Sequence, residues 1–281
     1  MEPNGLRRRC RRLRMVLACG ALLALASSRP GAVTAADAAP AAGPGPAAGA
    51  RTGGERMVER EVSVGGVVHR VAVRVPQDYD PARAWPLVVF LHGSGECGTD
   101  GLRQTRVGLG PALAAQPGRW PCLVVMPQKP SSARQWEEHE DLVLAAIADV
   151  RATWCIDPER IALTGLSQGG HGAWVLGARH PELFSCLAPV CGYGDAAAIA
   201  PLAQALPVWA FHGLRDDVVD PAGTLAIVEE IRRLRRAAGG DATAVRLTLY
   251  PEAGHDSWDA AYAEPELPGW LLGHRRGAVA P

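Results

Sequence analysis

GLSQGGHGAW, residues 165–174, is the most informative stretch of this chain. It encloses Ser167 between Gly165 and Gly169, and Gly170 and Gly172 follow directly. Within a regular element glycine costs roughly 0.5–1 kcal/mol relative to alanine, so this density indicates a steric requirement. The apolar run 160–164 predicts a buried strand before the stretch, and residues 173–178 predict a helix after it. The spacing therefore predicts a sharp strand-to-helix turn at residues 165–169.

G-x-S-x-G at such a turn is typical of a nucleophile elbow, in which the residues flanking a reactive serine must be small. The same letters also fit a glycine-rich turn whose serine merely caps a helix. The two interpretations differ in what they require elsewhere. A nucleophile needs an acid, a base and N–H donors for an oxyanion, in a defined chain order.

The N-terminal residues have the pattern of a targeting segment rather than of a folded domain. Arginines at 7–9 and 11–12 precede an apolar run at 15–26, which is too short to span a bilayer. Small residues follow, so residues 1–36 predict a signal peptide cleaved near Ala35 or Ala36, and a secreted or periplasmic protein without stable membrane insertion. The choice between general and twin-arginine export stays open. Residues 37–56, rich in Ala, Pro and Gly, predict a flexible linker before one domain at 57–275.

Charge and cysteine usage narrow the class further. The chain has 29 basic and 29 acidic residues, so no electrostatic basis for nucleic-acid binding exists. None of the cysteines after the signal peptide has metal-site spacing; these are Cys97, Cys122, Cys155, Cys186 and Cys191. In an exported protein some could pair. Cys155 and Cys186, both near strand starts, are the best candidates for a disulfide.

The rest of the domain alternates between predicted strands and helices. Valines alternate on either side of Gly65-Gly66, which predicts an antiparallel hairpin. Continuous apolar runs at 86–91, 122–126, 161–164, 186–190, 207–211 and 245–250 predict buried parallel strands, separated by helical patterns such as 136–154 and 221–238. The prediction is an α/β fold with a mainly parallel eight-stranded sheet, helices on both faces and no cap domain, because residues 192–206 are too few to form one.

Three loops at predicted strand ends carry suitable chemistry. After 86–91 comes His92-Gly93-Ser94-Gly95-Glu96, where the N–H of Ser94, together with that of Gln168, is expected to form an oxyanion hole. After 207–211, the acid is Asp216 or Asp217 rather than Asp220, and the residues alone do not separate the first two. After 245–250, the order serine, acid, histidine selects His255, since the other late histidine, His274, lies at the C-terminus.

LHGSGECGTD, LTGLSQGGHGAW, FHGLRDDVV and GHDSWDAAY together resemble the secreted, cap-less α/β hydrolases labelled "predicted peptidase". That group is similar to the phospholipase/carboxylesterase family, to polyhydroxybutyrate-depolymerase-like and feruloyl esterases, and to prolyl-oligopeptidase catalytic domains. The resemblance implies that Asp216 is the acid. The chain departs from the family pattern at Cys97, where arginine is common, and at Asp220, where proline is common.

These observations predict a serine esterase acting on a small-molecule or polymer ester, with Ser167, Asp216 and His255 as a triad and without metal or organic cofactor. A peptidase with the same triad and a non-catalytic binding module are the rival hypotheses. Trp136 begins the predicted helix 136–154, Trp258 follows His255 by three residues, and both are candidates for an apolar substrate pocket. Alternatively, both indoles pack helix starts against the sheet.

Overall fold

The computed structural model describes residues 56–203 and 205–277. The predicted signal peptide at 1–36 lies outside this range, as does the predicted linker except for its last residue, Arg56, which already begins strand β1. Strands β1 (Arg56–Val64) and β2 (Val67–Val75) form the predicted antiparallel hairpin. Gly65 and Gly66 close it at φ 56° and 80°, where a side chain would be strained.

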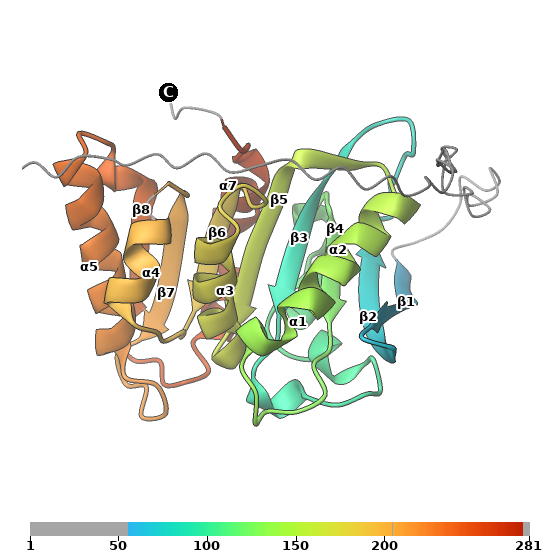
Figure 1. Ribbon diagram of the computed structural model, residues 1–281, viewed down its shortest axis with the longest axis horizontal. Helices are drawn as coiled ribbons and strands as arrows, with labels where there is room; N and C mark the ends of the chain where they lie inside the picture. The colour runs from blue at the N-terminus through green and yellow to red at the C-terminus, as the bar shows by residue number, and fades with distance from the viewer. Residues whose placement is uncertain (1–55, 204, 278–281) are drawn as a thin grey trace, which may run out of the picture. The chain divides into compact units, whose positions relative to one another are not determined.

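A single eight-stranded sheet organises the domain, in the order β1-β2-β4-β3-β5-β6-β7-β8 (Figure 1). β2 pairs antiparallel with both β1 and β4, and every pairing from β4 to β8 is parallel. The predicted α/β-hydrolase type of sheet is therefore confirmed. The remaining strands are β3 (Trp85–Leu91), β4 (Leu123–Pro127), β5 (Ile156–Leu166), β6 (Cys186–Val190), β7 (Val208–Gly213) and β8 (Val245–Tyr250).

Helices cover both faces of the sheet, and each face has its own apolar cluster. One cluster joins the sheet to α2 (Glu140–Thr153), α3 (Gln168–Arg179), α4 (Ala196–Ala203) and α5 (Pro221–Ala237), which lie on the near side in Figure 1. The other joins it to α1 (Leu109–Ala115), α6 (Trp258–Ala263) and α7 (Leu267–Gly273). Short 3-10 helices lie in the loops: η1 (Ser94–Glu96), η2 (Arg103–Thr105), η3 (Pro117–Arg119), η4 (Trp136–His139) and η5 (Ala242–Ala244).

Burial on both faces explains why the central strands read as continuous apolar runs. Every residue of β3, β4, β6 and β7 is buried. Their parallel arrangement brings the carboxyl ends of β3, β5, β7 and β8 to one edge of the sheet, as the paired ends Leu91 with Gly165 and Gly213 with Tyr250 show. Ligands bind at this edge in open α/β sheets. Between β6 and β7 the described residues form only one helix, α4.

The expected Cys155–Cys186 disulfide is wrong. All five cysteines among the described residues are free thiols. Cys155 is exposed and precedes β5, whereas Cys186 is buried and pairs with Ala162, well along that strand. The two thiols therefore lie at different heights of the sheet. Among the described residues, no helix combines the length and the apolar character needed to cross a bilayer.

Candidate active site

Ser167 occupies a strained turn between β5 and α3. Its φ of 52° and ψ of −116° lie outside the regions that non-glycine residues normally adopt, and Gln168 begins the helix immediately afterwards. The Ser167 N–H donates to Val190 O at 3.0 Å, and the Ser167 carbonyl accepts from His171 N at 2.9 Å. These bonds hold the turn, so the side chain is presented at the carboxyl edge of the sheet.

The glycines of the opening stretch are required by close backbone approach. A Cβ on Gly169 would lie 1.9 Å from Leu91 O, one on Gly165 would lie 2.3 Å from Gly169 O, and one on Gly170 would lie 2.4 Å from Val190 O. Real Cβ atoms essentially never come within 3.0 Å of another heavy atom. The first turn of α3 is thereby packed directly onto the ends of β3 and β6.

The structure brings Ser167, His255 and Asp216 into one hydrogen-bonded series. Ser167 Oγ lies 2.9 Å from His255 Nε2, and His255 Nδ1 lies 2.8 Å from Asp216 Oδ2. Since a carboxylate only accepts, His255 carries its proton on Nδ1, and its Nε2 is left to accept from the serine hydroxyl. His255 is 20% exposed, and the Asp216 side chain is fully buried.

Asp216 is held as a carboxylate. Its Oδ1 accepts the N–H groups of Val218 at 3.0 Å and Val219 at 2.8 Å. Burial raises the pKa of this carboxyl, but the Val219 and Val218 N–H groups and the His255 ring lower it more, so its pKa lies below the ordinary value. Asp217 is exposed, and Asp220 caps α5 by accepting from Ala222 N at 2.8 Å. Of the three carboxylates, only Asp216 reaches the histidine.

Cys191 is a buried thiol next to His255 and Asp216. Donor atoms of Cys191, Asp216 and His255 lie within 4.8 Å of one another, a spacing that could hold a metal ion. Burial raises the pKa of the Cys191 thiol to about 12, which keeps it protonated, whereas metal ligation needs the thiolate. His255 and Asp216 are already bonded to each other. The donor chemistry therefore suits a serine relay better than a metal site.

The loop after β3 packs against the serine. A Cβ on Gly93 would lie 2.9 Å from Leu166 Cδ1 and 3.5 Å from Ser167 Cβ, so the backbone that leads into Ser94 passes beside the nucleophile candidate. Ser94 begins η1, and Gln168 begins α3. The two residues expected to supply oxyanion N–H groups thus flank the same serine.

His92 anchors this loop from below. It is fully buried, its Nε2 accepts from Lys129 N at 3.1 Å, and its Nδ1 lies 2.6 Å from Gly93 O. The acceptor role of Nε2 places the proton on Nδ1, which donates to Gly93 O. Burial lowers the pKa of His92 to about 4, so the ring is neutral at pH 7.

The expectation that Trp136 lines a substrate pocket is wrong. Trp136 is 0% exposed, and its Nε1 donates to His92 O at 3.0 Å. A Cβ added to Gly172 would lie 2.7 Å from the Cβ of Trp136, so the two residues are closely packed. Trp136 is part of the support for the loop. Trp258 is partly exposed and contacts the His255 ring edge-to-face, with 5.3 Å between ring centroids.

Lys129, the only lysine in the sequence, was missed by motif reasoning. Its Nζ donates to Ser131 O at 2.9 Å, Arg134 O at 2.6 Å and Gln168 Oε1 at 2.6 Å. The side chain is fully buried, and burial lowers the pKa of its ammonium group. The one available signal was its position just after the end of β4, at the same edge as the other loops.

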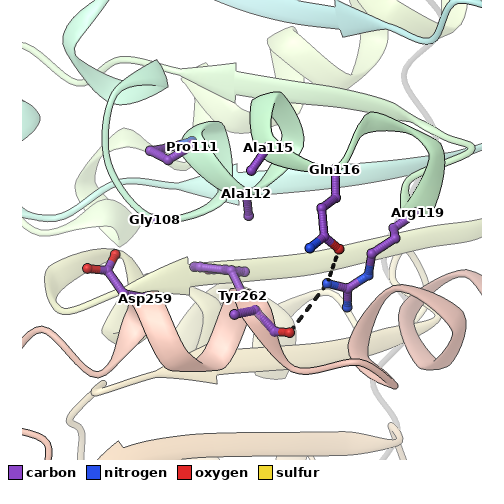
Figure 2. A pocket seen from close by; sticks show the side chains of 9 residues that line it. Gly108, Pro111, Ala112, Ala115, Gln116, Arg119, Asp259 and Tyr262 are labelled. Atoms are coloured by element: carbon purple, nitrogen blue, oxygen red, sulfur yellow. Dashed lines mark hydrogen bonds between the residues drawn. The ribbon is translucent and has the colours of Figure 1, made fainter.

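A hollow of about 220 Å³ lies between α1 and α6, on one face of the sheet (Figure 2). At one end Arg119 donates to Gln116 Oε1 and to Ala263 O, as the dashed lines mark. Gly108 and Tyr262 also contribute to its lining, whereas none of the residues expected in the site does.

Comparison with known proteins places the chain in a family. The fold is of the α/β-hydrolase type, and the family model described as "Putative esterase" matches residues 66–210, just over half of the chain. The chain therefore belongs to this esterase family.

The structure of a thermostable esterase is similar over 78% of this chain and 63% of that one, with 31% identity and a TM-score of 0.67. The feruloyl esterase module from Clostridium thermocellum matches 79% of this chain and 88% of that one, with a TM-score of 0.62. The two sequences are 18% identical, so this similarity shows a shared fold only. Poly(3-hydroxyalkanoate) depolymerase C of Paucimonas lemoignei is 29% identical over 40% of this chain and 28% of that protein. The chain spans between 28% and 52% of the length of the curated relatives it matches.

Proposed function

We propose that this protein is a serine hydrolase that cleaves carboxylic esters, with Ser167 as nucleophile, His255 as general base and Asp216 as the acid that orients it. The observation that carries the proposal is the continuous series Ser167 Oγ–His255 Nε2–His255 Nδ1–Asp216 Oδ2, with distances of 2.9 and 2.8 Å. The strained backbone of Ser167 adds support, because such strain is kept where it serves a function.

In the proposed mechanism Ser167 Oγ attacks the acyl carbon while His255 Nε2 takes its proton. Asp216, already a carboxylate, keeps the Nδ1 proton in place and stabilises the imidazolium that forms. The N–H groups of Gln168 and Ser94 receive the oxyanion. His255 then returns the proton to the leaving alcohol, and a water molecule activated by the same ring releases the acid from the acyl-enzyme.

The substrate is proposed to be a small-molecule or polymer ester, in keeping with the esterase family and with the named activities of its relatives. Trp258, which is partly exposed beside His255, offers an apolar surface for an acyl or aryl group. We expect the substrate to reach the site and the leaving group to depart without passing a cap, since the described residues between β6 and β7 contribute only α4.

A substrate panel tests the proposal. Purified protein is assayed with p-nitrophenyl esters of graded acyl length, methyl ferulate, a poly(3-hydroxybutyrate) emulsion and peptide p-nitroanilides, beside Ser167→Ala. We expect ester turnover that Ser167→Ala abolishes. Turnover of peptides alone would replace the esterase proposal by a peptidase, and the absence of any turnover would support a binding module instead.

We also propose that the protein is exported, on the basis of its arginine-rich start and the apolar run at 15–26. N-terminal sequencing of the protein from the native host should find a mature chain beginning just after Ala35 or Ala36, in the periplasm or the medium. An intact N-terminus in the cytoplasm would contradict export.

A further inference from the structure

His212 is a buried histidine that the proposed mechanism leaves unused. It lies in β7, four residues before Asp216, and both side chains are 0% exposed. Its Nε2 is 3.2 Å from Asp216 Oδ2, the oxygen that also faces His255, and 3.0 Å from Val219 O. The ring therefore contacts both the carboxylate and the loop that carries it.

The neighbours of His212 determine where its proton lies. Nε2 faces two oxygens that only accept, Val219 O and Asp216 Oδ2, so a bare Nε2 would oppose two lone pairs. On the other side, Nδ1 lies 2.8 Å from Thr224 Oγ1, a hydroxyl that also lies 2.9 Å from Gly192 O and can donate to either. With the proton on Nε2, the Thr224 hydroxyl donates to the bare Nδ1, so that every nitrogen of the ring faces a suitable partner.

The ring is neutral at pH 7. Burial lowers the pKa of His212 by more than the Val219 carbonyl and Asp216 raise it, and the proximity of His255 lowers it further. The titratable groups that face it are Asp216 from the acid loop and His255 from the loop after β8; α5 contributes Thr224, and the segment after β6 contributes Gly192 O. A neutral N–H is thus offered to Asp216.

We propose that His212 is a positioning residue for the acid of the triad: its Nε2–H shares Asp216 Oδ2 with His255 and fixes the Asp216–Val219 loop. Asp216 accepts N–H groups from Val218 and Val219 on Oδ1 and from His255 on Oδ2, and His212 Nε2 lies 3.2 Å from that same Oδ2. The inference rests on the proposed function, since it gives His212 a role only through a working relay. Two consequences follow: the carboxylate keeps one orientation, and part of its charge is taken up by a donor other than His255.

A matched pair of substitutions separates this role from simple space filling. The Nε2 amide of Gln in His212→Gln can reach the position of the histidine Nε2, whereas the shorter amide in His212→Asn can meet Thr224 but not Asp216. We expect His212→Asn to lower kcat roughly 10- to 100-fold with little change in KM, the size of effect that a displaced catalytic group produces. His212→Gln should recover most of kcat.

The pH profile gives a second readout that a structural role would not move. Without the Nε2–H, Asp216 Oδ2 interacts with His255 alone and favours its protonated form, so the acidic limb of kcat/KM should move to higher pH in His212→Asn. Thr224→Val, which removes the hydroxyl that orients the ring, should shift the limb in the same direction but less. It also provides a test if His212→Asn does not fold.

His180→Asn serves as a control, because His180 ends α3 and bonds to Glu140 and Glu182. Its kcat and pH profile should equal those of the wild type. An unchanged kcat and pH profile in folded His212→Asn, or equal losses in the Asn and Gln variants, would overturn the role of His212 while the wild-type esterase activity upholds the proposed function. A wild-type protein without ester turnover would overturn both.

Discussion

Lys129 Nζ donates to Gln168 Oε1 over 2.6 Å, and this contact ties the loop after β4 to the residue that follows the proposed nucleophile. The backbone N–H of the same lysine donates to His92, which holds the loop leading into Ser94. One buried residue therefore links both segments that are expected to supply oxyanion N–H groups. We infer that the lysine side chain has a structural role, because its ammonium group donates to three acceptors of the protein itself.

Lys129→Met should weaken both the fold and turnover. Methionine fills similar space but removes the ammonium group that donates to Ser131 O, Arg134 O and Gln168 Oε1. We expect a loss of roughly 2–5 kcal/mol in the free energy of unfolding, measured by denaturant titration, and a lower kcat. Arg233→Met removes an exposed guanidinium that pairs with Glu230, and should change the free energy of unfolding far less. Equal losses in the free energy of unfolding for Lys129→Met and Arg233→Met would contradict the structural role of Lys129.

Gly169→Ala should be among the most damaging single-methyl changes in the domain. Its Cβ would lie 1.9 Å from Leu91 O and 2.6 Å from His92 O, both backbone atoms that cannot move without shifting β3. We expect a loss of roughly 3–5 kcal/mol in stability, or an insoluble protein. Gly223 lies in the first turn of α5, where an added Cβ would meet nothing within 4 Å. The free energy of unfolding of Gly223→Ala should therefore stay within about 1 kcal/mol of the wild-type value. A mild Gly169→Ala would show that the turn is not packed as described.

The stability of the protein should fall on acidification through the titration of His92. Its pKa is lowered from 6.5 to about 4, so below pH 6.5 the unfolded chain binds a proton that the folded chain does not. The free energy of unfolding therefore decreases as the pH falls from about 6.5 to about 4, by on the order of 3 kcal/mol from this residue. Urea titrations at several pH values give the free energy of unfolding of wild type and His92→Gln as a function of pH, and the two curves should converge toward pH 4. If the difference between the two free energies is the same at every pH, His92 is not a neutral, buried histidine.

Asp216→Asn should lower kcat by on the order of 10⁴-fold, because an amide in place of the carboxylate favours the wrong tautomer of His255. Asp217→Asn should leave kcat within a few-fold of the wild type, since Asp217 is exposed and only Asp216 bonds to His255. Steady-state kinetics on a p-nitrophenyl ester compare the two variants directly. The reverse ranking would assign the acid to the neighbouring residue.

Local patterns were sufficient for the sheet but not for all its boundaries. The apolar runs 186–190 and 245–250 coincide with β6 and β8. β5 begins at Ile156, five residues before the predicted start, because Ile156 already pairs with Trp85 of β3 although Asp157, Pro158 and Glu159 interrupt the apolar pattern after it. The pairing register with β3 shifts between Ile156 and Ile161, and an apolar pattern does not encode such an irregularity.

The site was predictable where chain order or strand ends constrain it, and not where long-range contacts do. Ser167 and His255 could be expected from their loops, whereas the choice of Asp216 over Asp217 depended on a family resemblance. The burial of Trp136 under His92 and the contact of Lys129 with Gln168 join residues 44 and 39 positions apart. No local pattern encodes such contacts, because each depends on how two loops meet after the sheet has formed.

Covalent labelling of Ser167 is the most direct test of the proposed nucleophile. The wild-type protein is treated with a fluorophosphonate, digested with trypsin and analysed by mass spectrometry, with Ser167→Ala and Asp217→Asn treated in parallel. Cleavage after Arg160 and Arg179 yields the peptide 161–179, whose only serine is Ser167. We expect the phosphonyl mass on that peptide at Ser167 in wild type and Asp217→Asn, and none in Ser167→Ala. An unlabelled wild-type Ser167, or labelling that persists in Ser167→Ala, would contradict a Ser167–His255–Asp216 hydrolase.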